Sequence, residues 1–187
     1  MSKTTITREE RDFYKKQIET TISIVETFSN NNEFSPTMLI NSLLSLVVLP
    51  FEAAKKHDRT KTFPGSLETV MKSFLCYPEI FSPIKCCNGE KVLYGNKTIY
   101  SFVNKFRNGI AHQNLRVNVD ENRNITITIY NIFVSGACKN CKNKVCKEKG
   151  LSPSRGKVED FRITVTVPQL QKIALYIANS YLKSMDE

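Results

Sequence analysis

The chain has 187 residues, of which 41% are apolar, and it carries a formal net charge of +9. This length suits one domain with its own core, and the apolar content excludes a disordered chain. The first residues contain no apolar stretch typical of a signal peptide, and the most apolar run, residues 38–51, is interrupted by Asn41 and two serines. We therefore expect a buried helix in that run rather than a membrane span, and a single cytoplasmic domain over residues 1–187.

The first third of the chain has the pattern of helices. Thr7 and Glu10 have the spacing of a capping box, which predicts a helix from residue 8 to the asparagines at 30–32. A second helix begins at Ser35 and Pro36 and is apolar nearly all round, so we expect it at the centre of the fold, with Pro50 kinking or ending it. A short third helix follows over residues 66–75. The apolar stripe predicted for the first helix consists of Phe13, Ile18, Ile22, Val25 and Phe28.

The second half changes from helical to strand periodicity and back. Residues 96–112 predict a fourth helix, because apolar side chains recur at every third or fourth position. Residues 115–119 and 124–133 then alternate apolar and polar, as a hairpin does, and residues 160–167 repeat this alternation before a last helix that opens at Pro168. The predicted fold is mainly α: four to five helices with a small three-stranded antiparallel sheet inserted before the C-terminal helix.

An arginine and a histidine lie five positions apart near the end of the fourth helix, in the stretch FRNGIAHQN at residues 106–114. With about 100° per residue, Asn108 lies at about 180° and His112 at about 220° from the apolar stripe, and Arg107 lies at about 80°, on its flank. Gly109 costs a helix about 1 kcal/mol relative to alanine. We expect it to make room for a backbone or a ligand.

The six residues from Arg107 to His112 resemble the R-x4–6-H motif of the HEPN superfamily. The apolar stretch 41–52, the motif and the strands after it are similar to a HEPN-type nuclease branch associated with mobile elements and plasmids. The resemblance implies a HEPN-like helical bundle that cleaves RNA without a metal ion. It also implies a homodimer through the face that carries the motif, so that two copies line one cleft.

This chemistry suits the residue types of the motif. The RNA 2′-hydroxyl must lose a proton as it attacks the adjacent phosphate, and the leaving 5′-oxygen must gain one. Histidine can perform either transfer near neutral pH, Arg107 would hold the phosphoryl oxygens, and Asn108 would position the phosphate or His112. The products would carry 2′,3′-cyclic phosphate and 5′-hydroxyl ends.

The resemblance also suggests a toxin or anti-phage role, with an antitoxin or another regulatory partner. Some HEPN toxins have a tyrosine two residues after the histidine, which a partner nucleotidyltransferase modifies. That position is Asn114 here, which argues against a partner that acts through such a tyrosine. The second histidine, His57, is expected to be a polar residue at a helix end.

A basic, cysteine-rich insertion is predicted at about residues 134–159. Residues 138–157 contain seven Lys or Arg and one Glu, a net charge of +6 in this segment alone. Three of its thiols have close spacing, and Cys86 or Cys87 is available as a fourth ligand, so structural zinc and reduced surface thiols are both open. The thiols are Cys138, Cys141 and Cys146, and the lysines expected to contact RNA phosphates are Lys139, Lys142, Lys144 and Lys147.

Two further functions compete with the nuclease. One is a HEPN module that binds RNA or a protein without catalysis. The other is a zinc-stabilised nucleic-acid adaptor in which the cysteine-rich insertion binds the nucleic acid and the bundle is a scaffold.

Overall fold

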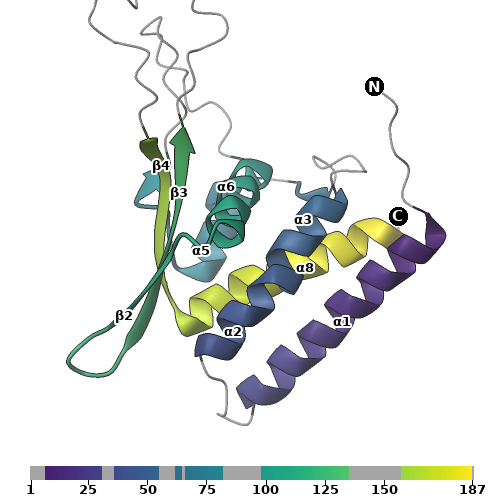
Figure 1. Cartoon of the computed structure of the whole chain (residues 1–187), viewed down its shortest axis with the longest axis horizontal. Helices are drawn as coiled ribbons and strands as arrows, with labels where there is room; N and C mark the ends of the chain where they lie inside the picture. Colours follow the sequence, from purple (N-terminus) through teal and green to yellow (C-terminus); the bar gives the residue numbers. More distant parts are fainter. Residues whose placement is uncertain are drawn as a thin grey trace, which may run out of the picture.

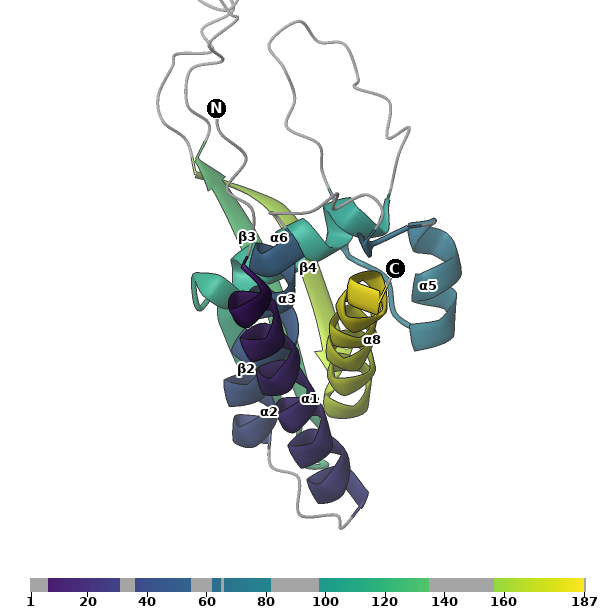
Figure 2. The same ribbon diagram turned by 90° about the vertical axis from the view of Figure 1, so that its right-hand side faces the viewer.

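The computed structural model places helices on one face of an antiparallel sheet (Figure 1, Figure 2). It describes residues 7–30, 36–54, 62–64, 66–81, 98–134 and 157–186. The helical bundle with a sheet before the C-terminal helix confirms the predicted fold class. The helices are α1 (Arg8–Asn30), α2 (Pro36–Leu43), η1 (Leu44–Val48), α3 (Leu49–Ala54), α5 (Leu67–Phe74), α6 (Ile99–Ala111) and α8 (Val167–Asp186).

Helix α1 begins with the predicted capping box. The Glu10 carboxylate accepts a hydrogen bond from the Thr7 amide at 3.0 Å, and the Thr7 hydroxyl accepts one from the Glu10 amide at 3.2 Å. Ile18 and Val25 are fully buried, but Phe13 is 64% exposed, which corrects its predicted place in the stripe. The reason is its spacing, because Phe13 is five positions before Ile18, which turns its side chain about 140° away from that of Ile18.

The central helix runs from α2 through η1 into α3 without ending at Pro50. Segment η1 is a π-helical turn, in which the Leu49 amide donates to the Leu44 carbonyl five residues earlier. Such a turn is wider than an α-helical one, which gives the ring of Pro50 room and lets the helix continue to Ala54. Of the two alternatives predicted for Pro50, a kink or an end of the helix, the end is wrong.

The central helix is also long and apolar enough, over Thr37–Ala54, to cross a membrane. In the structure it forms the middle of the bundle instead, contacting α1, α6 and α8. Leu39, Leu43, Leu46, Val47 and Phe51 are fully buried there. This is the packing of a core helix, as the sequence predicts.

The sheet has the order β1-β4-β3-β2, and all neighbouring strands are antiparallel. The three predicted strands are present, and β1 adds a two-residue edge strand that the sequence analysis does not predict. Pairing of Val134 with Lys157 narrows the insertion between β3 and β4 to residues 135–156. The strands are β1 (Ile80–Phe81), β2 (Leu115–Val119), β3 (Ile125–Val134) and β4 (Lys157–Thr166).

One face of the sheet forms the core together with α6 and α8. Ile129 of β3 lies opposite Ile163 of β4, and both are fully buried. The predicted stripe of α6 meets this face, and every member of it is buried: Ile99, Phe102, Val103, Phe106 and Ile110. The C-terminal helix buries its predicted face as well, with Ile173 and Ile177 fully buried.

Strand β3 crosses α6 so closely that only glycine fits at position 109. A Cβ atom on Gly109 would lie 2.7 Å from Cγ2 of Ile129 and 2.8 Å from the carbonyl oxygen of Tyr130. Both distances are shorter than any ordinary contact, and the second involves backbone that is held in the sheet. The space that Gly109 provides is therefore filled by the chain's own backbone rather than by a ligand.

We predict that Gly109→Ala destabilises the protein. Alanine gains about 1 kcal/mol of helix propensity, but overpacking against backbone that is held in β3 costs about 2–3 kcal/mol and separates α6 from the sheet. Urea denaturation should show a net loss of about 1–2 kcal/mol. Asn104→Ala on the same helix is the control, because it gains helix propensity at a position turned about 140° away from Gly109. A Gly109→Ala protein as stable as the parent would contradict the close crossing.

Candidate active site at the end of helix α6

The Arg-x4-His motif occupies the last turn of α6. His112 caps the helix and is exposed to solvent. Gln113 follows with φ of 55°, a left-handed conformation that reverses the chain. The amide of Asn114 donates to the Gly109 carbonyl at 2.8 Å, and that of Gln113 donates to the Ile110 carbonyl at 3.0 Å. These two bonds form a Schellman motif, with glutamine where glycine is usual, so the backbone that carries His112 is well fixed.

The end of the motif is also joined to the sheet. The amide of Tyr130 on β3 donates to the carbonyl of Asn114 at 3.1 Å. Gly109 contacts the same residue of β3 from the helix side. The turn after His112 is therefore held by the helix on one side and by the strand on the other.

Arg107 points into the bundle, and only 16% of its side chain is exposed. Its guanidinium forms an ion pair with Glu52 of α3, lies 5.5 Å from the ring centre of Phe51, and donates from Nη1 to the amide oxygen of Asn108 at 2.5 Å. Burial lowers the pKa of Arg107 from its ordinary value, which is so far above neutral that the group stays charged. These contacts hold the plane of the guanidinium in one orientation.

The guanidinium keeps hydrogen-bonding capacity beyond these contacts. Its Nε is buried without a hydrogen-bond partner in the part of the chain that the structure describes. A guanidinium has five N–H donors, and the contacts to Glu52 and Asn108 do not engage all of them. Arg107 is thus a pre-oriented donor rather than a free surface charge.

Asn108 and His112 are placed differently from each other. The amide oxygen of Asn108 orients Arg107, and its backbone carbonyl accepts from the His112 amide at 3.0 Å. Within the described residues, the imidazole of His112 has no hydrogen-bond partner and is open to solvent. One subunit therefore holds its arginine against α3 and its histidine at the helix end, and does not join them in one pair.

Glu52 is a residue of this site that the sequence analysis did not single out. Its side chain is 36% exposed and faces Arg107 from α3. A signal was present in the sequence, because Glu52 is the one charged residue between positions 36 and 54. A carboxylate in an otherwise apolar, buried helix usually has a charged partner.

The remaining predicted site residues lie outside the part of the chain that the structure describes. They are His57, Cys86, Cys87, Cys138, Cys141, Cys146, Lys139, Lys142, Lys144 and Lys147. The described residues contain no group of three His, Cys, Asp or Glu side chains that would hold a metal ion. Structural zinc and lysine contacts to RNA in the insertion stay predictions, and metal analysis of the purified protein would decide the first.

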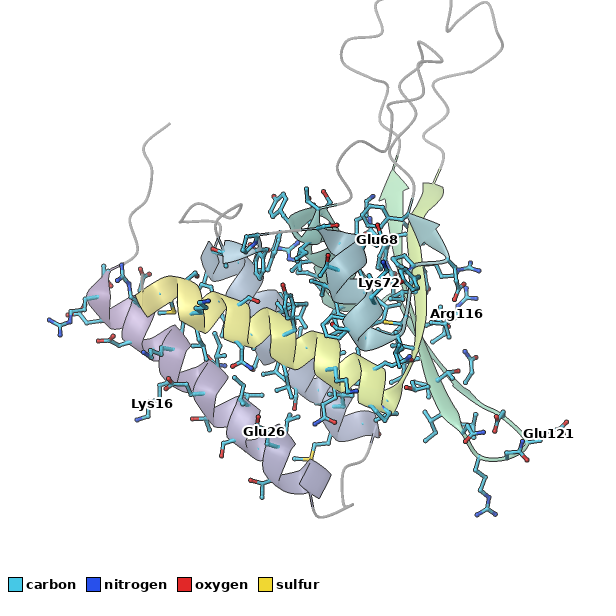
Figure 3. All side chains as sticks on the ribbon, turned by 180° about the vertical axis from the view of Figure 1, so that it is seen from behind. Lys16, Glu26, Glu68, Lys72, Arg116 and Glu121 are labelled. Atoms are coloured by element: carbon cyan, nitrogen blue, oxygen red, sulfur yellow. The ribbon has the colours of Figure 1, made fainter. Side chains whose placement is uncertain are left out.

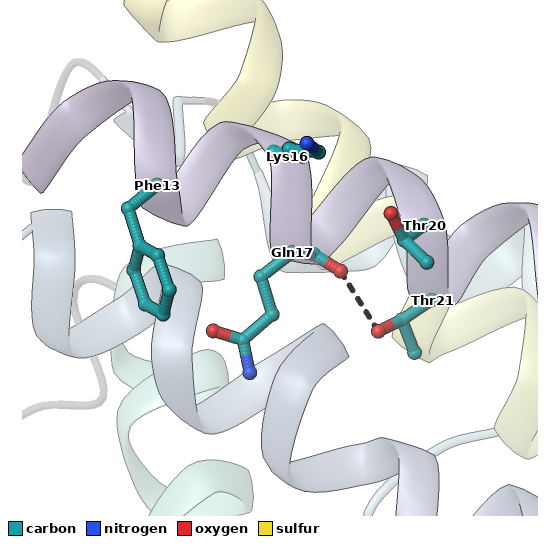
Figure 4. A pocket seen from close by; sticks show the side chains of 5 residues that line it. All are labelled: Phe13, Lys16, Gln17, Thr20 and Thr21. Carbon is teal, nitrogen blue, oxygen red and sulfur yellow. Dashed lines mark hydrogen bonds between the residues drawn. The ribbon is translucent and has the colours of Figure 1, made fainter. Parts of the chain in front are cut away.

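A shallow depression on the surface lies away from the motif (Figure 4). It is lined by α1 alone, where the exposed ring of Phe13 stands beside Lys16 and Gln17, and the Thr21 hydroxyl donates to the Gln17 carbonyl at 2.9 Å. It contains no residue of α6, and its lining residues include neither an arginine nor a histidine. It therefore does not contribute to the site at the end of α6.

Comparison with known proteins identifies a family for the whole chain. The family model described as HEPN pEK499 p136 matches residues 1–187. No curated protein and no solved structure matches the chain. The chain therefore belongs to the HEPN pEK499 p136 family, a HEPN family associated with plasmid elements, and this membership indicates a nuclease or an RNA-binding module.

Proposed function

We propose that the protein is a homodimeric, metal-independent endoribonuclease of HEPN type that acts in the cytoplasm. The observation that carries this proposal is that one helix end holds both a pre-oriented Arg107 and an exposed His112. An arginine that is already held in place stabilises charge without reorganising, whereas a proton carrier must reach the substrate. The association of the family with plasmid elements supports a toxin or anti-phage role, with an antitoxin or another regulatory partner.

The proposed reaction is a transesterification followed by release of two RNA ends. The 2′-oxygen attacks the phosphorus and loses its proton to one imidazole, the bond from phosphorus to the 5′-oxygen breaks, and that oxygen takes a proton from an imidazolium. Arg107 stabilises the charge that builds on the phosphoryl oxygens. The products carry a 2′,3′-cyclic phosphate and a 5′-hydroxyl.

The second subunit supplies what one subunit lacks. A base and an acid are both needed, and each chain has one histidine at this site. A twofold axis near the end of α6 would bring two copies of His112 to one phosphodiester, one as base and the other as acid. The alternative is a HEPN module that binds RNA or protein without cleaving it.

We predict that His112→Ala and Arg107→Ala abolish RNA cleavage measured in the presence of EDTA. Loss of the proton carrier should slow cleavage about 10²- to 10⁴-fold, and loss of the guanidinium about 10²- to 10³-fold. His57→Ala and Arg11→Ala are matched controls. Analysis of the ends formed by the parent should find cyclic phosphate and 5′-hydroxyl.

Two results would contradict this assignment. If both variants cleave RNA at the rate of the parent protein with chelator present, the nuclease proposal fails. RNA binding by the parent without any product would instead favour the non-catalytic module.

We predict that subunits share one active cleft. When parent and His112→Ala chains are exchanged in equal amounts, activity should fall to about one quarter, because only dimers with two intact histidines cut. Independent active sites would leave about one half. Activity measured over a range of mixing ratios separates a squared from a linear dependence on the parent fraction.

We predict that Glu52→Gln weakens both the fold and the site. The amide keeps the shape of the side chain but leaves the charge of Arg107 without its counter-ion, which should cost about 1–3 kcal/mol of stability and reduce cleavage less than Arg107→Ala does. Glu68→Gln is the matched control, because the Glu68–Lys72 pair at 3.0 Å is fully on the surface (Figure 3). Equal effects of the two substitutions would show that Glu52 does not orient the arginine.

A further inference from the structure

The outer face of the sheet has a polar and cationic character that the core does not require. Buried and half-buried residues alternate along β3. Ile127 and Ile129 are fully buried, whereas Thr128 and Tyr130, which follow them in turn, are only half-buried. Alternate residues of a strand point to opposite faces, so these side chains lie on the face away from the helices. Figure 1 shows that no described helix covers this face.

An arginine and a tyrosine stack on this outer face. The guanidinium carbon of Arg116 on β2 lies 5.1 Å from the ring centre of Tyr130 on β3. Arg116 is exposed, and Figure 3 shows it on the side of the sheet away from the helices. Arg162 on β4 is the register partner of Tyr130, so the tyrosine has an arginine on each neighbouring strand.

The strands that carry Arg116 and Tyr130, β2 and β3, contain no acidic residue. Beside these two residues, the hydroxyls of Thr128 and Thr164 lie 3.0 Å apart and bond to each other across β3 and β4. On β4, Glu159 and Asp160 precede Arg162, so the positive charge that no acid on the same strand offsets is that of Arg116. This local charge has the same sign as the net charge of +9, so the face suits an anionic partner.

We propose that the row of Arg116, Tyr130 and Arg162 binds single-stranded RNA. Tyr130 holds the Arg116 guanidinium flat, and the outer plane of the guanidinium is then a surface on which an unpaired base stacks. The positive charge of Arg116 attracts the adjoining phosphate. A base within a duplex is already stacked on its neighbours, so this arrangement favours a single strand.

The row lies close to the candidate active site. Arg116 is four residues after His112, which limits the distance between their Cα atoms to about 14 Å. The backbone of Tyr130 bonds directly to Asn114, at the end of the motif. A strand bound on the sheet face would therefore reach His112 around the edge of β2. That the ligand is RNA rests on the proposed function, whereas the stacking surface does not depend on cleavage.

Binding by the full-length His112→Ala protein, which leaves RNA intact, tests the proposal. The probe is a fluorescently labelled single-stranded RNA, compared with the same sequence as a duplex and with a strand that lacks its central bases. Tyr130→Ala and Arg116→Ala should each weaken binding of the single strand about 5- to 100-fold. The duplex and the strand without central bases should bind the His112→Ala protein less tightly than the intact single strand does.

Conservative variants separate stacking from charge. Arg116→Lys keeps the charge but removes the plane, so it should weaken binding nearly as much as Arg116→Ala, while Tyr130→Phe keeps the ring and should bind as the parent does. Tyr77→Ala and Lys183→Ala, an exposed tyrosine and an exposed lysine elsewhere, are the controls. Thermal unfolding of each variant verifies that it is folded.

Three outcomes would overturn the proposal: no binding of the single strand, unchanged binding by Tyr130→Ala, or full binding by Arg116→Lys. Its failure is distinct from failure of the nuclease. If the parent cleaves RNA and these variants bind it as the parent does, only the proposal of a stacking surface is refuted. Binding that follows the expected pattern without any cleavage by the parent removes the nuclease alone.

Discussion

The contact of strand β3 with Gly109 is the constraint on which the rest of the site depends. Helix α6 and the sheet are packed so tightly that the strand's backbone takes the place of a side chain. This contact sets where α6 ends relative to the sheet, and the Schellman motif and the bond from Tyr130 to Asn114 follow from it. The helix propensity lost at Gly109 is offset by burial of the neighbouring stripe against Ile129 and its partners. His112 is therefore exposed on a backbone that has little freedom.

Arg107 depends on a second and separate constraint, the path of the central helix. A helix that ended at Pro50 would not carry Glu52 to the guanidinium, and the π-helical turn before the proline allows the helix to continue. A fully exposed ion pair contributes little, because water screens it. The half-buried pair with Glu52 orients the arginine, and Phe51 beneath it excludes water from one side of the group.

The sequence was most informative where a feature depends on neighbouring residues. The capping box at Thr7, the stripe of α6 and the alternation of the three longer strands are all local patterns, and the structure confirms them. Phe13 was misplaced because it is five positions before Ile18, whereas residues of one helical stripe are three or four positions apart. The π-helical turn before Pro50 and the two-residue strand β1 depend on tertiary packing and on pairing with β4, which no local pattern specifies.

The site was predicted less completely than the fold for the same physical reason. The position of Arg107 on the flank of the helix follows from the helical period, and the structure places it there. Its partner Glu52 is 55 positions earlier, and the strand that makes Gly109 necessary comes 20 positions later, so neither was identifiable from the motif alone. The stacking of Arg116 on Tyr130 likewise requires the register of β2 and β3.

Tyr130 connects these features in a single residue. Its carbonyl lies against Gly109, its amide holds the turn after His112, and its ring supports Arg116 on the opposite face of the sheet. The backbone of Tyr130 thus helps to fix the position of His112, while its side chain forms part of the outer surface of the sheet. Because these roles belong to different atoms, a substitution of the ring changes the outer face but retains both backbone contacts. A shift of the strand itself would displace the histidine and the arginine of the sheet together, so the proposed binding surface and the proposed cleavage site are held in fixed relation by β3.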